Sequence, residues 1–105
     1  MDHPPEQLPG WIAVLDAGDV QFLRRFLLSS GSLKALAEDY EVSYPTVRAR
    51  LDRLIEKARA AEDPRVRDPL ERRLRVLVAD GKLEPSTARE LLDLHRNGSK
   101  RRTPP

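Results

Sequence analysis

Apolar residues recur three and four positions apart along most of the chain, which is the spacing of helices with one buried face. The first such helix is expected from Asp16 to Leu28, with Asp16 as N-cap and Asp19 as an acidic capping-box partner. Ser29 to Gly31 ends it, because glycine tolerates a left-handed conformation. Ser32 caps a second helix over Leu33 to Tyr40. No segment alternates in polarity as a strand would, so the pattern predicts an all-α protein.

The third helix is expected to begin after its cap Ser43, with Pro45 in the first turn, where no backbone N–H is needed. Its apolar stripe consists of Val47, Leu51, Leu54, Ile55 and Ala58. The fourth helix covers about Leu70 to Ala79. The fifth begins at Pro85 and stops at Asn97 and Gly98. The predicted organisation is a flexible arm (1–10), a helix-turn-helix domain (11–61), a hinge (62–69), a C-terminal two-helix hairpin (70–98) and a basic disordered tail (99–105).

The helix-turn-helix prediction rests on the spacing of residues from the second helix to the third. The small side chain of Ala37 lets the two helices cross closely, Val42 is expected to fill the turn from below, and Ser43 caps the next helix. Glycine usually occupies the position of Glu41, where a positive φ is common, so the turn departs from the usual pattern. An ordinary three-helix core is the alternative interpretation.

The segment from Leu15 to Ile55 resembles the bacterial helix-turn-helix family named domain of unknown function 2089. The most specific part of the resemblance is SYPTVRARLD, from Ser43 to Asp52. The resemblance implies a regulator of transcription and no known ligand. Longer members carry an N-terminal cysteine zinc ribbon, which this chain lacks, so zinc binding does not carry over.

Charge and composition narrow the classes of function. Residues 43–61 hold five basic and two acidic side chains, whereas residues 1–42 hold three and seven, so positive charge is concentrated in the third helix and the tail. The chain has no cysteine and no apolar run of about 20 residues, so a cytoplasmic protein is expected. His3 and His95 lack metal-ligand spacing, and no phosphate loop occurs. We therefore expect no enzyme, no metal and no cofactor.

These observations predict a sequence-specific DNA-binding regulator whose recognition helix, about Ser43 to Ala60, enters the major groove of double-stranded DNA. Because a helix advances about 100° per residue, Pro45, Ala49, Asp52 and Glu56 point away from the apolar stripe, and Arg48 and Arg53 flank them on opposite sides. The expected DNA contacts are Ser43, Tyr44, Pro45, Thr46, Arg48, Ala49, Arg50, Asp52, Arg53 and Lys57.

The individual roles follow from side-chain chemistry. Arg48 would read a guanine edge or a phosphate, and Tyr44 and Thr46 would bind a phosphate or a base edge. Ser43 and nearby backbone N–H groups would hold a phosphate at the helix N-terminus. Backbone phosphates are the expected partners of Arg50, Arg53 and Lys57, and Asp52 could accept from cytosine. Alternatively, Arg48 with Asp52 and Arg53 with Glu56 form plain surface ion pairs.

The leucines of the hairpin need a further surface, since two helices of about ten residues do not bury them alone. Either they cover the first helix of the same chain or they pair with a second subunit, and we favour a homodimer because two-fold symmetry doubles the DNA contact. The expected dimerisation residues are Leu70, Leu74, Leu77, Leu91 and Leu92. The alternative function is a protein-interaction module, in which the acidic Glu38, Asp39 and Glu41 bind a basic partner from the transcription machinery.

Overall fold

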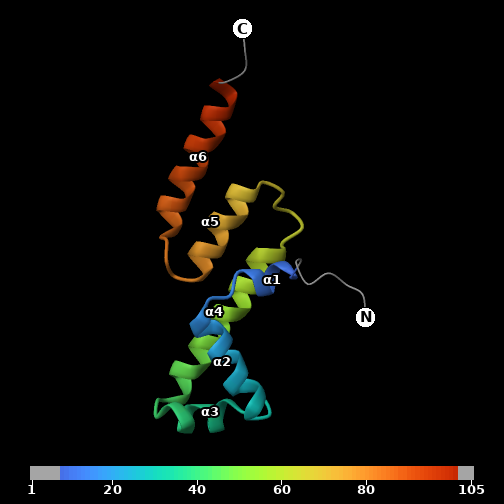
Figure 1. Ribbon diagram of the computed structural model, residues 1–105. Helices are drawn as coiled ribbons and strands as arrows, with labels where there is room; N and C mark the ends of the chain where they lie inside the picture. Colours follow the sequence, from blue (N-terminus) through green and yellow to red (C-terminus); the bar gives the residue numbers. More distant parts are fainter. Residues whose placement is uncertain (1–7, 102–105) are drawn as a thin grey trace, which may run out of the picture.

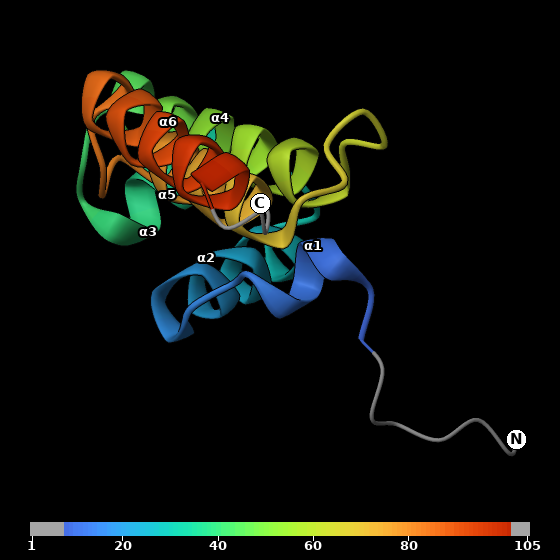
Figure 2. The same ribbon diagram turned by 90° about the horizontal axis from the view of Figure 1, so that it is seen from above.

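The fold is all-α, as predicted, and no strand occurs within residues 8–101, which the computed structural model describes, with side chains as far as Gly98. The helices are α1 (Gly10–Ala13), α2 (Ala17–Leu28), α3 (Leu33–Tyr40), α4 (Tyr44–Glu62), α5 (Pro69–Ala79) and α6 (Pro85–Arg101). The long α4 connects a helix-turn-helix unit at one end of the molecule to the α5–α6 hairpin at the other (Figure 1). Seen from above, α4, α5 and α6 lie on one side and α1 and α2 on the other (Figure 2).

The N-terminal caps of α2 and α3 form as the sequence predicts. The Asp16 side chain accepts from the backbone N–H of Asp19 at 2.8 Å, and the Asp19 side chain accepts from the N–H of Asp16 at 3.1 Å. This reciprocal arrangement is a capping box, here with aspartate in place of glutamate. Ser32 caps α3 by accepting from the N–H of Ala35. Each cap satisfies a donor that the first turn of a helix leaves unpaired.

The core of the helix-turn-helix unit consists of five buried residues from three helices: Phe22, Leu36, Ala37, Val47 and Leu54. Leu15, Leu23, Phe26, Leu33 and Leu51 pack around them. Ala37 is 6% exposed where α3 meets α4, so the small residue lies where the spacing places it. Of the predicted stripe on α4, Val47 and Leu54 are buried and Leu51, Ile55 and Ala58 are half-buried, so the predicted side of α4 faces inward.

The turn between α3 and α4 tolerates the missing glycine. Glu41 adopts φ 57° and ψ 44°, the left-handed conformation that the sequence pattern assigns to this position. The N–H of Val42 then reaches the carbonyl oxygen of Ala37 at 3.0 Å and closes the end of α3. Val42 itself is 43% exposed, so the expectation that it fills the turn from below is wrong.

Two helix boundaries differ from the sequence expectation. A short helix, α1, precedes the first predicted helix, and it packs against α4. Helix α6 continues through Asn97 and Gly98 to Arg101 instead of stopping there. A glycine inside a helix destabilises the helix by only about 1 kcal/mol. A glycine therefore ends a helix only where it adopts the left-handed conformation of a C-terminal cap. The rest of the predicted tail, 102–105, and residues 1–7 of the predicted arm lie outside the described residues.

The segment between α4 and α5 is attached to the helices on both sides. Val66 is 3% exposed, and the Arg72 guanidinium donates to the carbonyl oxygens of Ala61 and Val66. Asp68 caps α5 by accepting from the N–H of Leu70. Helix α5 packs against α4, and α6 packs against α5. The hairpin therefore covers one flank of the second half of α4.

Candidate nucleic-acid interface

The first half of α4 presents an open surface to solvent. Val47 and Leu54 are buried, while the predicted contacts on the opposite side are exposed, among them Tyr44 at 51%. The exposed members of the predicted set are Ser43, Tyr44, Pro45, Thr46, Arg48, Ala49, Asp52 and Arg53. The hairpin lies beside the second half of the helix and leaves this end free (Figure 1). The structure therefore brings eight of the ten predicted residues together on one accessible surface.

The N-terminus of α4 is fixed by its cap. Ser43 Oγ accepts from the N–H of Thr46 at 3.3 Å and lies 2.8 Å from Thr46 Oγ1. Pro45 occupies the first turn and needs no acceptor there. The two hydroxyls form one exposed polar pair at the end of the helix where the macrodipole favours an anion. This arrangement suits a phosphate oxygen.

Arg48 pairs with Asp52 at 3.2 Å, and both side chains are about half exposed, at 51% and 54%. The ion pair that we considered as an alternative for these two residues is therefore present. An exposed pair of this kind contributes only about 0–1 kcal/mol. Arg48 can therefore exchange Asp52 for a nucleic-acid acceptor at little cost. Arg53 does not pair with Glu56, which instead accepts from Arg59 at 2.9 Å.

Lys57 is 2% exposed and points into the protein, so our assignment of this residue to a phosphate is wrong. Its ammonium lies 2.6 Å from Asp19 Oδ2 and 3.1 Å from Asp80 Oδ2. Burial lowers the pKa of Lys57, but the hydrogen bonds to the two carboxylates outweigh it and raise the pKa above 10.5. The ammonium is therefore charged at neutral pH and fully engaged inside the fold.

Arg50 also faces the interior more than the sequence suggests. Its Nη2 lies 3.1 Å from Asp19 Oδ1, and the guanidinium carbon lies 5.8 Å from the centre of the Phe22 ring. Its Nε is buried. The outward contact predicted for Arg50 therefore needs correction, because the side chain is committed to α2. Spacing contains the missed signal: Lys57 follows Leu54 by three positions on the buried side of α4, and Arg50 flanks Val47.

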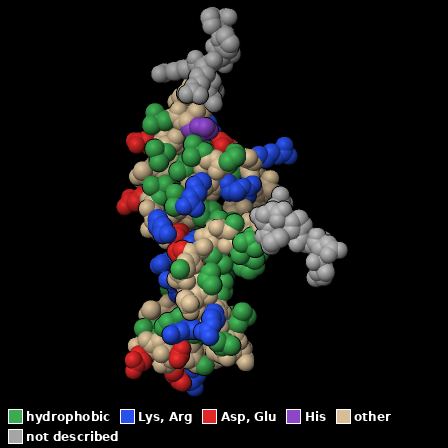
Figure 3. Space-filling model, viewed as in Figure 1, with side chains coloured by type: hydrophobic (Ala, Val, Ile, Leu, Met, Phe, Trp, Pro, Cys, Tyr) green, Lys and Arg blue, Asp and Glu red, His purple; other side chains and the backbone are tan. Residues whose placement is uncertain are grey.

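The hairpin divides the leucines predicted for dimerisation into two groups. Leu74 is 6% exposed, and Leu77 and Leu92 are half-buried, so these three pack largely within one chain. Leu70 and Leu91 remain 38% and 41% exposed, and Leu94, which the sequence analysis missed, is 63% exposed. Figure 3 shows hydrophobic side chains gathered over the part of the molecule formed by α5 and α6.

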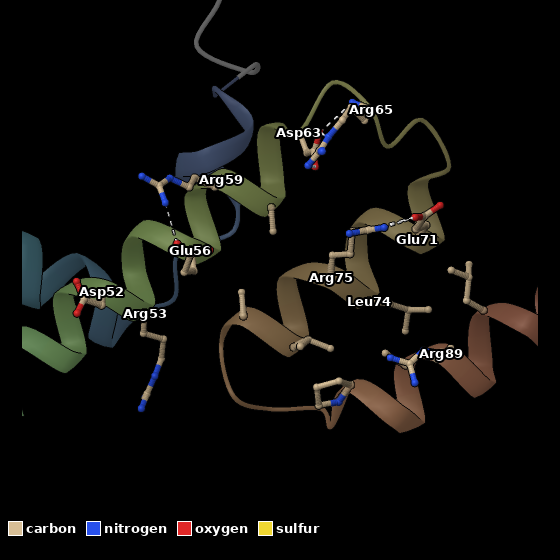
Figure 4. A pocket seen from close by; sticks show the side chains of 16 residues that line it. Asp52, Arg53, Glu56, Arg59, Asp63, Arg65, Glu71, Leu74, Arg75 and Arg89 are labelled. Atoms are coloured by element: carbon tan, nitrogen blue, oxygen red, sulfur yellow. Dashed lines mark hydrogen bonds and ion pairs between the residues drawn. The ribbon is translucent and has the colours of Figure 1, made fainter.

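A groove of about 770 Å³ lies between α4 and the hairpin. Leu74, Val78 and Leu92 contribute apolar side chains to it, and arginines from all three helices line it (Figure 4). Asp52 and Glu56 belong both to this groove and to the outward side of α4. The groove is therefore continuous with the exposed surface of that helix. Sequence reasoning missed it because α5 and α6 are placed by tertiary packing.

Comparison with known proteins gives one match. Residues 15–59 match the family described as "Domain of unknown function (DUF2089)-HTH", which confirms the resemblance predicted for Leu15 to Ile55. No curated protein and no solved structure matches the chain. Among residues 8–101, no helix is long and apolar enough to cross a membrane. The same residues contain no group of three or more His, Asp or Glu side chains that could hold a metal ion.

Proposed function

We propose that this chain, whose residues 15–59 match the helix-turn-helix family, is a sequence-specific DNA-binding regulator of transcription. We further propose that it acts in the cytoplasm and catalyses no reaction. The observation that supports DNA binding best is the two-sided character of the first half of α4. Val47 and Leu54 hold one side in the core, and the opposite side is exposed. A helix anchored in this way can enter the major groove of DNA, which is about 12 Å wide.

The exposed side chains suit contact with base edges and phosphates. Pro45 and Ala49 are small and permit close approach, whereas Arg48 can reach a guanine edge with two N–H groups. The two acidic residues on this side, Asp52 and Glu56, already pair with Arg48 and Arg59. The charge of Glu56 is therefore compensated by Arg59, and that of Asp52 is compensated as long as Arg48 stays beside it, which reduces the repulsion of an approaching phosphate.

We further propose that the regulator acts as a homodimer through the exposed side of the hairpin. Leu70, Leu91 and Leu94 leave apolar surface uncovered, and the radius of gyration is 17.7 Å, against about 13 Å for a compact domain of 100 residues. A second copy would cover these leucines. A two-fold dimer would also present two recognition helices to two half-sites.

A protein-interaction role is the second candidate, and α2 supports it. Val20, Leu27 and Leu28 on this helix are 50%, 73% and 69% exposed, which leaves apolar surface on the helix-turn-helix unit itself. The acidic Glu38 and Glu41 nearby in α3 and its turn would suit a basic partner. This candidate predicts binding to a protein of the transcription machinery in the absence of DNA.

Selection of binding sites from a random pool of duplexes separates the two functions. The proposal predicts one enriched sequence, bound at least about 1,000-fold more tightly than an unrelated duplex at the same salt concentration. Arg48→Ala should lower the affinity by about 1–3 kcal/mol and relax the preference at one base pair. Arg67→Ala, an exposed arginine outside α4, is the matched control and should change neither. Absence of any enriched sequence would reject sequence-specific DNA binding.

A further inference from the structure

The groove beside α4 has an apolar floor and charged walls. Leu74 and Val78 of α5 and Leu92 of α6 contribute the floor, and the walls are formed by side chains of α4 and α6 and of the segment between α4 and α5. Figure 4 shows Arg53 extending from α4, Arg89 extending from α6, and Leu74 of α5 on the side that faces α6. Residues far apart in the sequence therefore form one open channel along the flank of the proposed recognition helix.

Each carboxylate in this groove has an arginine partner within the chain. Asp52 pairs with Arg48 at 3.2 Å, and Glu56 pairs with Arg59 at 2.9 Å. Asp63 pairs with Arg65 at 2.9 Å, which holds the pKa of the Asp63 carboxyl at about 2 and keeps it charged. Glu71 accepts from both Arg75, at 2.9 Å, and Arg96, at 3.0 Å. The acidic side chains are therefore compensated and leave no net negative charge in the groove.

Arg53 and Arg89 differ from the other arginines of the groove. Within residues 8–101, no carboxylate forms an ion pair with either of them, although both side chains are exposed. Two guanidinium groups on α4 and α6 thus remain available to an anion that enters the groove. A guanidinium binds phosphate oxygens with two parallel N–H groups, so each of these side chains suits a phosphate.

We propose that the groove binds a sugar–phosphate strand that borders the major groove read by α4, with Arg53 and Arg89 contacting its phosphates. The inference rests on the proposed function and extends the DNA interface from the helix-turn-helix unit to the hairpin. Asp52 and Glu56 lie on both the outward side of α4 and the rim of the groove, so one duplex can reach both surfaces. The apolar floor would face the sugar rings.

A sugar–phosphate strand fits the groove better than an acidic helix of a protein partner. The uncompensated charges are two separate guanidiniums at the edges of an open channel, next to a helix already suited to DNA. An acidic helix would need a deep apolar cleft for its side chains, because its affinity comes from apolar anchors. Such a partner would leave DNA affinity independent of Arg89, so the experiment distinguishes the two occupants.

Fluorescence anisotropy with the selected duplex tests the proposal over about 50 to 200 mM potassium chloride. The affinity falls with salt, and the loss of one phosphate contact makes the slope of log affinity against log salt less negative by about 0.9. The same loss lowers the affinity roughly 5–10-fold near 0.1 M salt. We expect this result for Arg53→Ala and for Arg89→Ala, and about the product of the two losses for the double variant, since the residues lie on different helices. Arg73→Ala, which removes an exposed arginine of α5 outside the groove, should bind as the wild type does.

The length of the duplex supplies a second readout. Trimming the duplex on the side of the hairpin should abolish the effect of Arg89→Ala, whereas the effect of Arg48→Ala should persist. Wild-type binding with an unchanged salt slope in Arg89→Ala would overturn this inference and leave DNA binding by α4 intact. If the wild-type chain binds no duplex at any salt concentration, both the inference and the proposed function are wrong.

Discussion

The ammonium of Lys57, in the second half of α4, lies 2.6 Å from the Oδ2 atom of Asp19, in the first turn of α2. The same ammonium lies 3.1 Å from Asp80, at the end of α5, so one buried cation joins the helix-turn-helix unit to the hairpin. Arg50 and Lys82 complete the cluster by pairing with Asp19 and Asp80. This cluster fixes the orientation of α4 relative to the helices on either side of it.

Replacing Lys57 with methionine should destabilise the protein strongly. Asp19 and Asp80 would remain buried without their central partner, and breaking a buried ion pair costs about 3–5 kcal/mol. We expect about 3 kcal/mol, because Arg50 and Lys82 still lie beside the two carboxylates. Urea denaturation followed by circular dichroism measures the loss in the free energy of unfolding.

The exposed Lys34 is the matched control for this substitution. Lys34→Met should change the free energy of unfolding by no more than about 0.5 kcal/mol, as is usual for a surface site. Equal stability of the Lys57→Met and Lys34→Met variants would show that the buried cluster does not hold the fold together.

Lowering the pH should destabilise the folded protein, in part because Asp16 becomes protonated. The backbone N–H of Asp19 and the charges of Lys57 and Lys82 hold the pKa of the Asp16 carboxyl below its ordinary value of 3.8. A carboxyl with a lowered folded pKa stabilises the protein above its unfolded pKa, and this contribution is lost as the pH falls. The melting temperature should therefore decrease below about pH 4.

Asp16→Asn isolates this contribution, because asparagine caps a helix about as well as aspartate but does not titrate. Thermal unfolding from pH 7 to pH 3 should show a shallower acid decrease for the variant than for the wild type. If the plots of melting temperature against pH coincide for the two proteins once their values at pH 7 are aligned, Asp16 does not contribute to the acid sensitivity.

Glu41→Gly should stabilise the turn between α3 and α4. Glu41 has φ 57°, and the left-handed conformation costs a non-glycine residue about 1–2 kcal/mol. Glycine removes this cost but gains freedom in the unfolded chain, so the expected net gain is about 0.5–1 kcal/mol. Glu38→Gly, inside α3, should instead cost about 1 kcal/mol. A loss of stability in Glu41→Gly, measured by urea denaturation, would contradict this account of the turn.

Leu94→Gln should convert the proposed homodimer into a monomer. Leu94 is 63% exposed on α6, and a polar amide there would lose partner contacts without disturbing the core. Light scattering coupled to size-exclusion chromatography should give twice the mass of one chain for the wild type and one chain for the variant. Leu28→Gln, at a site 69% exposed on α2, should remain dimeric. A monomeric wild type would reject the dimer.

The parts of the structure that the sequence predicted are those that depend on neighbouring residues. Asp16 and Asp19 form the cap that their spacing implies, and Ser43 begins α4 as expected. The buried Val47 and Leu54 follow from the helical period alone, so the open side of the candidate interface could be predicted as well.

The parts that it did not predict depend on distant partners. Lysine side chains are almost never fully buried unless they are paired with an opposite charge. One partner of Lys57 is Asp80, which lies 23 positions away at the end of another helix. The spacing from Leu54 places Lys57 on the buried side of α4, but its pairing with Asp80 could not be inferred without the position of α5. The groove that Arg53 and Arg89 both line has the same origin, because both its walls and its floor depend on how the hairpin packs against α4.

The most direct test of the central claim is to map amide chemical shifts by nuclear magnetic resonance as the selected duplex is added to the full chain. If the exposed side of α4 binds DNA, the largest shifts should fall on residues 43–53, while the amides around Lys57 change little. Shifts confined to the outer side of α2 or to the leucines of the hairpin, with residues 43–53 unaffected, would contradict the account.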